Sequence, residues 1–410
     1  MLLFLFAVLG LLGGAAYCLT ADERARVMKV VGTVLEGDPK SEPFLTALRK
    51  RTSRTLATPA LVALNFLMLI PVLWDPATAG NTDALVELGA SFGPRTTNGE
   101  WWRLAKSMFL HAGLIHFVVC TGGLFQIGLV TERFVGPVAF VSVYFASGVI
   151  ATLASISESP LSVTLGASGA VFGVYGLLFS TSVWALLDDS PLKTSRKTLT
   201  RLAPAAAIFL LYSVVTGHLS FRAELVGFVV GVVGGAMLGR GIGYDKPSYG
   251  RSAVTAAAAI VIAVTTAFLF RGIDDARPEL GHVVAMEERT AEVYAAALDR
   301  FKKGRLRAED LALVIEKAIV PELHDADARL KAFDRVPTEY QALVASAEEY
   351  LRLRHDSWRM RADALRQMGQ LAGRKVGDSN PQAVTLALKQ AERTELDSFE
   401  SLKKIKPIAQ

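Results

Sequence analysis

A single serine stands among small residues at positions 166–169, where the sequence reads Gly-Ala-Ser-Gly. This residue, Ser168, lies near the start of an apolar run that reaches from Thr164 to Leu187. At a helix N-terminus, backbone N–H groups and the positive end of the helix dipole would face the serine. Such surroundings suit a nucleophile whose product is an oxyanion. The same small residues would also suit close packing of two membrane helices, so the pattern alone leaves both interpretations open.

Further polar side chains lie near the starts of two other apolar runs. His111 and His116 belong to one run, and Glu224, with His218 in the loop ahead of it, belongs to the other. A charge at mid-bilayer costs about 2.5–3.5 kcal/mol on insertion scales, so such groups usually face a cavity or a partner. The alternatives are ordinary interfacial histidines, and a glutamate that pairs with Arg222 or His218 or faces water.

The elements that must position these residues are predicted to be membrane helices. Of the 410 residues, 51% are hydrophobic and 20% are charged, which indicates a polytopic membrane protein with a soluble part. We expect an all-α fold and apply the criterion of roughly twenty apolar residues per span. The candidate spans lie at residues 2–19, 57–74, 108–130, 137–155, 166–187, 203–216, 222–239 and 253–270.

Basic residues set the orientation that we predict for these spans. Residues 20–56 are polar and end in a basic cluster, so the positive-inside rule places them in the cytoplasm. The spans then alternate, and the remaining basic loops fall on the same side. The helix starts that carry Ser168, His116 and Glu224 therefore lie near the outer surface, at similar depth. We interpret residues 1–19 as an uncleaved extra transmembrane helix, because no basic segment precedes them.

Residues 271–410 differ in composition from the rest of the chain. They are charged and alanine-rich, and apolar residues recur at helical spacing from Val344 to Met368. We expect a helical bundle or coiled-coil domain, which the alternation of spans places outside the cytoplasm. Its apolar stripe is the expected core. Nothing in it has a catalytic pattern, and any partner of this domain is unknown.

Several classes of site are not expected from the composition. The two cysteines, Cys18 and Cys120, both lie in apolar runs and suggest no disulfide framework. The net charge of +5 is spread over loops, so we predict no nucleic-acid partner. We also predict no cofactor and no metal site. The expected surroundings are a lipid bilayer, and we favour a bacterial inner (cytoplasmic) membrane.

Residues 57–240 resemble the six-helix core of the rhomboid intramembrane serine proteases. The stretch 99–103, Gly-Glu-Trp-Trp-Arg, resembles the family's tryptophan–arginine motif, and 111–116 resembles its histidine pair. The stretch 166–169 resembles the nucleophile motif. Other matching positions are Glu132, Gly136, Tyr144, Gly148, Phe172, Gly227, Gly231 and Gly235. The resemblance implies a rhomboid-like core, with the spans 2–19 and 253–270 as one extra transmembrane helix on each side.

The resemblance also implies roles for individual residues. Ser168 would be the nucleophile, and the oxyanion would be held by the Ser168 N–H, by His116 and by the position of Cys120. Phe172 would pack against the catalytic histidine. The other residues of the family's motifs, which would support the site, are Gly166, Gly169, His111 and Arg103.

Two positions depart from the family's pattern. Cys120 stands where the family has an asparagine, and a thiol is a weaker hydrogen-bond donor. Glu224 stands at the position of the dyad histidine, three residues before Gly227. A substitute base would be Glu224 itself, His218, or His116 at the expense of the oxyanion site.

Two hypotheses about function follow from these departures. The first is an intramembrane serine endopeptidase with a non-standard dyad, which cleaves transmembrane or juxtamembrane segments of membrane proteins. The second is an inactive pseudoprotease that binds transmembrane segments of client proteins. A transporter fits less well, because few polar residues lie elsewhere in the spans.

Overall fold

The computed structural model describes residues 42–75, 77–187, 190, 192, 207, 211, 221–239, 248–372 and 381–408. The chain divides into two compact units, Met1–Arg271 and Gly272–Gln410, which are described separately below. The predicted span at 2–19, most of the span at 203–216, and His218 lie outside the described residues.

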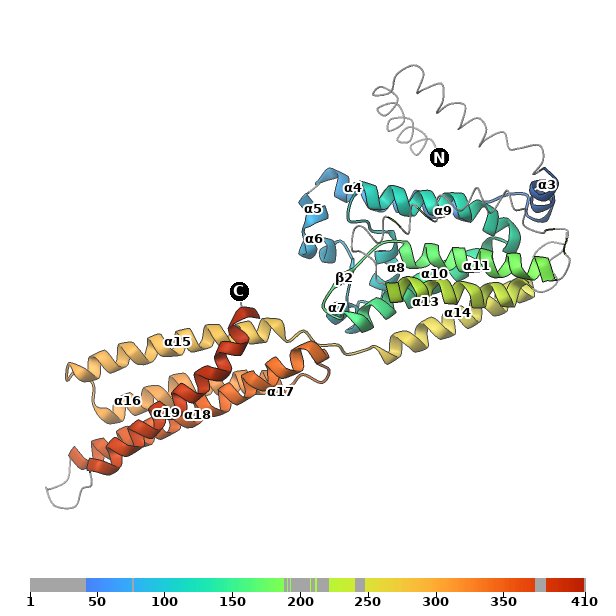
Figure 1. Ribbon diagram of the computed structural model, residues 1–410. Helices are drawn as coiled ribbons and strands as arrows, with labels where there is room; N and C mark the ends of the chain where they lie inside the picture. Colours follow the sequence, from blue (N-terminus) through green and yellow to red (C-terminus); the bar gives the residue numbers. More distant parts are fainter. Residues whose placement is uncertain are drawn as a thin grey trace. The chain divides into compact units, whose positions relative to one another are not determined.

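The first unit is built from long apolar helices. Within the described part of the chain, six helices are long and apolar enough to cross a membrane. This confirms the prediction of an all-α, multi-pass membrane protein. The six helices, labelled in Figure 1, are α4 (Ala57–Trp74), α9 (Leu114–Val135), α10 (Pro137–Glu158), α11 (Ser168–Leu187), α13 (Phe221–Gly239) and α14 (Tyr249–Leu269).

The helix expected from residue 108 begins later than predicted. Residues Ser107–Phe109 form a short 3-10 turn, η2, and Leu110 is extended. Gly113 follows with a φ of +154°, a conformation that L side chains rarely adopt, and α9 begins after it at Leu114. The apolar run therefore holds a bend that hydropathy does not register. His111 lies in this bend, whereas His116 lies in the first turn of α9.

The segment between α4 and α9 is structured rather than a plain loop. It contains α5 (Ala77–Gly80), α6 (Thr82–Glu87), α7 (Gly93–Thr97), α8 (Arg103–Lys106) and a two-residue strand, β1 (Ser91–Phe92). Strand β1 pairs antiparallel with β2 (Val163–Thr164), with Ser91 opposite Thr164. This pairing ties the segment to the residues just ahead of Ser168.

Glu132 joins the end of α9 to the start of α4. Its fully buried carboxylate accepts hydrogen bonds from the backbone N–H groups of Leu56, Ala57 and Thr58, and from the Thr58 hydroxyl, at 2.8–2.9 Å. The first N–H groups of a helix lack partners within it, so the carboxylate caps α4. At the same end, Arg51 of α3 (Glu42–Arg51) donates to the Phe134 carbonyl at 2.7 Å.

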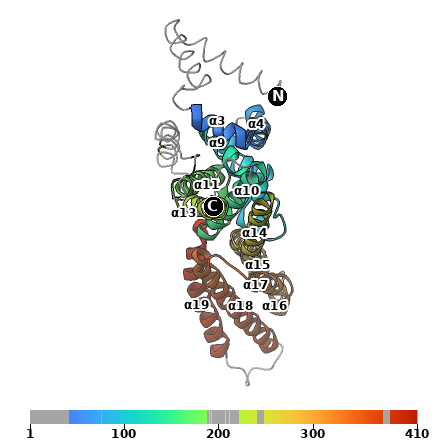
Figure 2. The ribbon, with the colours of Figure 1, turned by 90° about the vertical axis from the view of Figure 1, so that its right-hand side faces the viewer.

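The second unit is a helical bundle. Its helices are α15 (Arg277–Lys302), α16 (Ala308–Val314), α17 (Val320–Lys331), α18 (Thr338–Ala372) and α19 (Pro381–Ile405), and the 3-10 turn η4 (Lys406–Ile408) ends it. A π-helical turn, η3 (Ile315–Ile319), precedes Pro321, whose missing N–H interrupts the regular helical pattern there. Helices α18 and α19 pack along one another as a long hairpin (Figure 2).

The apolar stripe of α18 enters the core of this bundle. Ala347, Leu351, Trp358 and Leu365 are buried, and Met368 packs against them. A charged group is buried with them: the Arg354 guanidinium pairs with Glu287 at 2.8 Å and with a second carboxylate, on Glu395, also at 2.8 Å. Tyr350 donates to Glu287, and Arg361 also pairs with Glu395. Buried charges of this kind are tolerated when they are paired and hydrogen-bonded.

Candidate active site

Helices α11 and α13 are in backbone contact. A Cβ placed on Gly227 would lie 3.0 Å from the Gly169 carbonyl carbon, and one on Gly231 would lie 2.7 Å from that of Gly173. Each would lie closer still to the carbonyl oxygen. Only residues without a side chain permit this approach, which is the small-residue packing typical of membrane helices. The two helices lie side by side in Figure 1.

These glycine contacts set the register between the two helices. The partner of Gly227 is Gly169, and the partner of Gly231 is Gly173, so the helices run parallel with a constant offset. Applied to the residues before Gly227, the offset brings Glu224 level with Gly166, two positions before Ser168. At 1.5 Å per residue, Ser168 and Glu224 differ by about 3 Å along the helix axes. Ser168 is half-buried, and Glu224 is 5% exposed.

The His116 ring packs against the backbone just ahead of Ser168. Gly166 has a φ of +110°, and a Cβ there would lie 2.6 Å from Cε1 and 2.9 Å from Nε2 of the His116 ring. Glycine is therefore required at this position by both conformation and space. The Gly166 N–H donates to the Ser107 carbonyl at 2.8 Å. This bond fixes the turn that leads into α11, and no side-chain signal in the sequence could reveal it.

His111, in the bend before α9, packs against His116. The two rings are 5.1 Å apart between centroids and nearly perpendicular, at 70°. His111 is fully buried, and its Nδ1 lies 3.2 Å from the Phe109 carbonyl oxygen. Packing against Phe117, with centroids 5.5 Å apart, holds the ring from another direction. The structure thus brings both predicted histidines together beside Gly166.

The remaining predicted residues divide into two groups. Cys120 is buried one turn after His116, with the Ala167 backbone within hydrogen-bonding reach of its sulfur and Glu224 close enough to act on it electrostatically. Phe172 lies one turn after Ser168, and its ring centroid is 6.4 Å from that of Tyr175.

Arg103 is not part of this group. It is buried within the segment between α4 and α9, where it pairs with Glu100 and donates to the carbonyls of Val86 and Ala90. The side chain therefore organises that segment and does not reach Ser168.

Arg222, one of the alternative partners considered for Glu224, does not pair with it. The Arg222 guanidinium instead lies 3.6 Å from the carboxylate of Glu158, at the end of α10. Among the described residues, Glu224 forms neither a hydrogen bond nor an ion pair, and it is not hydrogen-bonded to Ser168. The carboxyl group is therefore buried near the level of the serine, without a balancing charge from the part of the chain that the structure describes.

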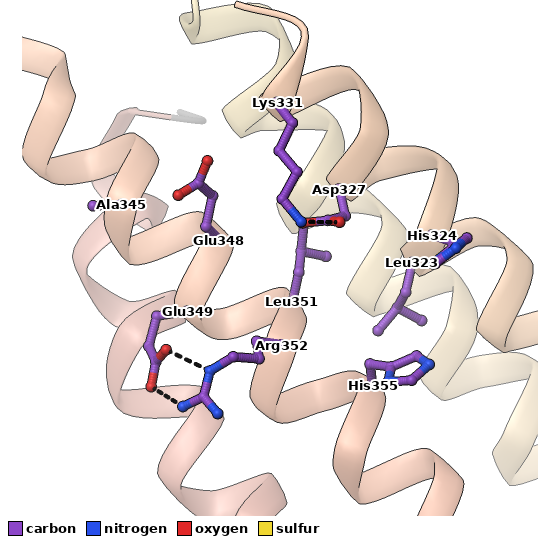
Figure 3. A pocket seen from close by; sticks show the side chains of 10 residues that line it. All are labelled: Leu323, His324, Asp327, Lys331, Ala345, Glu348, Glu349, Leu351, Arg352 and His355. Carbon is purple, nitrogen blue, oxygen red and sulfur yellow. Dashed lines mark hydrogen bonds and ion pairs between the residues drawn. The ribbon is translucent and has the colours of Figure 1, made fainter.

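A separate groove lies in the second unit, between α17 and α18 (Figure 3). It has a volume of about 420 Å³, and His324 and His355 stack at one end with centroids 6.4 Å apart. Two ion pairs lie along it, Asp327 with Lys331 at 2.6 Å and Glu349 with Arg352 at 2.7 Å. No group of three metal-ligating side chains was found in the described parts of the chain.

The fold and the site define a multi-pass helical membrane protein with a serine at the meeting point of two parallel helices. Residues 98–241 match the model of the Rhomboid domain, so this part of the chain is a Rhomboid domain. The family resemblance on the sequence motifs is thereby confirmed.

Three relatives illustrate the range of this family. The chain is 29% identical over 214 residues to "Rhomboid protease GluP" of Bacillus subtilis (strain 168), covering 52% of this chain and 39% of the relative. It is 41% identical over 81 residues to "Putative rhomboid protease YdcA" of the same organism, covering 20% and 41%. It is 30% identical over 146 residues to "Inactive RHOMBOID-like protein 8" of Arabidopsis thaliana, covering 34% and 39%. The chain thus spans less than half the length of each of these relatives.

Proposed function

We propose that this protein is an intramembrane serine endopeptidase that cleaves transmembrane or juxtamembrane segments of other membrane proteins. The observation that carries the proposal is the register of α11 against α13. It holds Ser168 and Glu224 within about one helical turn of each other, beside the His116 ring. A nucleophile, a group able to accept its proton and a donor for an oxyanion are thus gathered at one membrane depth.

The proposed reaction follows the logic of serine proteases with a different base. The Ser168 hydroxyl attacks the scissile carbonyl carbon, and its proton passes to the Glu224 carboxylate. The tetrahedral oxyanion is held by the Ser168 N–H and by His116. When the C–N bond breaks, the Glu224 proton passes to the leaving amine and an acyl-enzyme remains. Water then adds to the ester carbon and gives a proton to Glu224. As the bond between the ester carbon and the Ser168 oxygen breaks, that proton returns to the serine oxygen, which releases the carboxylic acid and restores Ser168 and Glu224.

Cys120 is expected to make this reaction slow. A thiol is a weaker donor than the amide of the family's asparagine, and loss of one oxyanion donor costs about 100- to 1,000-fold in rate. We therefore expect Cys120→Asn to raise the rate of cleavage. The Cys120 thiol has no other evident role in the proposed reaction.

A second candidate function is a pseudoprotease that binds transmembrane clients without cutting them. Glu224 at the dyad histidine position favours it, because an unperturbed carboxylate is a poor base at neutral pH. A relative named as an inactive RHOMBOID-like protein supports this second function. In this function the same site would hold the client segment.

The two functions are separated by a cleavage assay on the full chain. The purified protein in lipid vesicles would be given a cleavable transmembrane reporter and compared with Ser168→Ala, Glu224→Gln and Glu224→His. Ser162, an exposed serine ahead of α11, supplies the matched control Ser162→Ala. We expect cutting that Ser168→Ala abolishes, that Glu224→Gln reduces and that Glu224→His raises.

A fluorophosphonate probe provides a second measurement. Labelling of Ser168 in the native protein, absent in Ser168→Ala, would report an activated serine. No cutting and no labelling, with the reporter still bound, would refute the endopeptidase and support the pseudoprotease.

We further propose an arrangement of the chain in a bacterial inner membrane. In it, residues 1–19 form an extra transmembrane helix, 20–56 are cytoplasmic, 57–240 form the core and 253–270 a last span. Residues 271–410 would then lie outside the cytoplasm. Basic residues near the ends of spans support this orientation, because they remain on the cytoplasmic side. An alkaline phosphatase fused after residue 410 should be active, and an inactive fusion would reverse the orientation.

A further inference from the structure

Glu224 has an unusual position for an ionisable group in a membrane. It lies in the first turn of α13, within the membrane-spanning part of the chain, and only 5% of it is exposed. No cation among the described residues pairs with it, because Arg222 is engaged by Glu158. Ionisable groups inside membranes usually pair with one another or face a water-filled cavity. A partner from outside the chain would meet this requirement.

The neighbours of Glu224 determine which part of such a partner can approach its carboxyl group. The Cys120 thiol is buried and lies close enough to Glu224 for an electrostatic interaction. The half-buried Ser168 lies about 3 Å further along the helix axes. Beyond Ser168 the glycine backbones of α11 and α13 are in contact, so a client segment does not pass between these two helices there. A client that reaches Ser168 therefore brings its own residues to the level of Glu224.

We propose that Glu224 selects transmembrane clients that carry a lysine or an arginine at its depth, by forming an ion pair with that cation. This inference rests on the proposed function, in that the site binds transmembrane segments, but it applies to cutting and non-cutting forms alike. A basic residue left alone in a bilayer is costly, and so is a buried carboxylate without a partner. Each group relieves the cost of the other when the client binds.

The ion pair also has a consequence for cleavage. A carboxylate that holds a client's cation is a weaker proton acceptor, because the positive charge stabilises its ionised form. Clients with a basic residue at this depth should therefore be retained and cut slowly. Clients without one leave Glu224 free to accept the Ser168 proton. The same residue would thus sort clients into those held and those cut.

The test is a binding measurement on the full chain in vesicles of zwitterionic phosphatidylcholine, which carry no net surface charge to attract a peptide. The Ser168→Ala background prevents cutting during the measurement. The probes are labelled transmembrane peptides of about twenty leucine and alanine residues, with one Lys scanned over the outer third. Matched peptides carry Gln or Glu at the same positions. Binding is read from energy transfer to a label on the protein.

We expect at least one Lys position to bind about tenfold or more tightly than its Gln counterpart, in line with the cost of leaving a buried charge unpaired. Glu224→Gln should remove this preference, and Glu224→Lys should transfer it to the Glu peptide. Asp83→Asn is the control, because this exposed carboxylate lies in α6, away from the membrane helices, and its loss should leave the preference unchanged. The transferred preference of Glu224→Lys also shows that loss of binding is not a folding defect.

Equal binding of the Lys and Gln peptides at every position would overturn the proposal, as would a preference that survives Glu224→Gln. Failure of this proposal can be told apart from failure of the endopeptidase proposal. If the native protein prefers Lys peptides but does not cut them, the ion-pair proposal stands and the endopeptidase proposal is refuted. If the native protein cuts peptides with and without Lys equally well, the endopeptidase proposal stands and the ion-pair proposal is refuted.

Discussion

The contact between α11 and α13 predicts a large effect from one added methyl group. In Gly231→Ala the new Cβ would lie 2.7 Å from the Gly173 carbonyl carbon, whereas ordinary contacts begin at 3.4 Å. The two backbones must therefore separate by at least about 0.7 Å, and such overpacking costs about 1–3 kcal/mol. The same shift moves Glu224 away from Ser168, so any cleavage or client binding should fall with stability.

The chain offers a matched control for this substitution. Gly122 also lies in a membrane helix, α9, but a Cβ there meets nothing within 4 Å. Gly122→Ala should be neutral or stabilise by about 0.5–1 kcal/mol through helix propensity. The two variants should therefore differ by about 1–4 kcal/mol in favour of Gly122→Ala.

Thermal unfolding in detergent, followed by fluorescence-detected size exclusion, measures this difference. We expect Gly231→Ala to melt clearly below the native protein and Gly122→Ala to melt at or above it. Equal melting temperatures for the two variants would show that α11 and α13 are not in backbone contact at Gly231. The register argument for Ser168 and Glu224 would then fail as well.

Glu132→Gln retains only part of the acceptor capacity for the N–H groups at the start of α4 and the Thr58 hydroxyl. The free energy of unfolding in detergent should therefore fall by about 1–3 kcal/mol. Arg354→Met leaves the Glu287 carboxylate buried without its cation and should destabilise the second unit by about 3–5 kcal/mol in denaturant titrations followed by circular dichroism; adding Glu287→Gln should restore part of the loss. Burial and the Glu287 carboxylate raise the pKa of Tyr350, so the folded state keeps a proton that the unfolded state loses near pH 10. This contribution to stability is complete below about pH 10 and declines above it, so Tyr350→Phe should flatten the alkaline decline, and an unchanged slope would contradict the assignment.

The composition and motifs of the chain were sufficient to predict its structural class. Hydropathy is a local property, so apolar runs of sufficient length predicted the membrane helices that the structure describes from α4 to α14. The spacing of the motif residues around His116 and Ser168 was sufficient to predict the Rhomboid domain. The helical stripe of α18 likewise predicted buried residues such as Leu351 and Trp358.

Contacts between distant segments depended on the tertiary structure. The sequence left Arg222 as a partner for Glu224, but the end of α10 supplies Glu158 to it instead. Arg103 belongs to a family motif, yet its hydrogen bonds lie within its own segment, away from Ser168. The bend at Gly113 that separates His111 from α9 is equally invisible to hydropathy. The physical reason is common to all three: hydropathy and spacing report what one segment favours, whereas charge pairing and helix register depend on which backbone lies opposite.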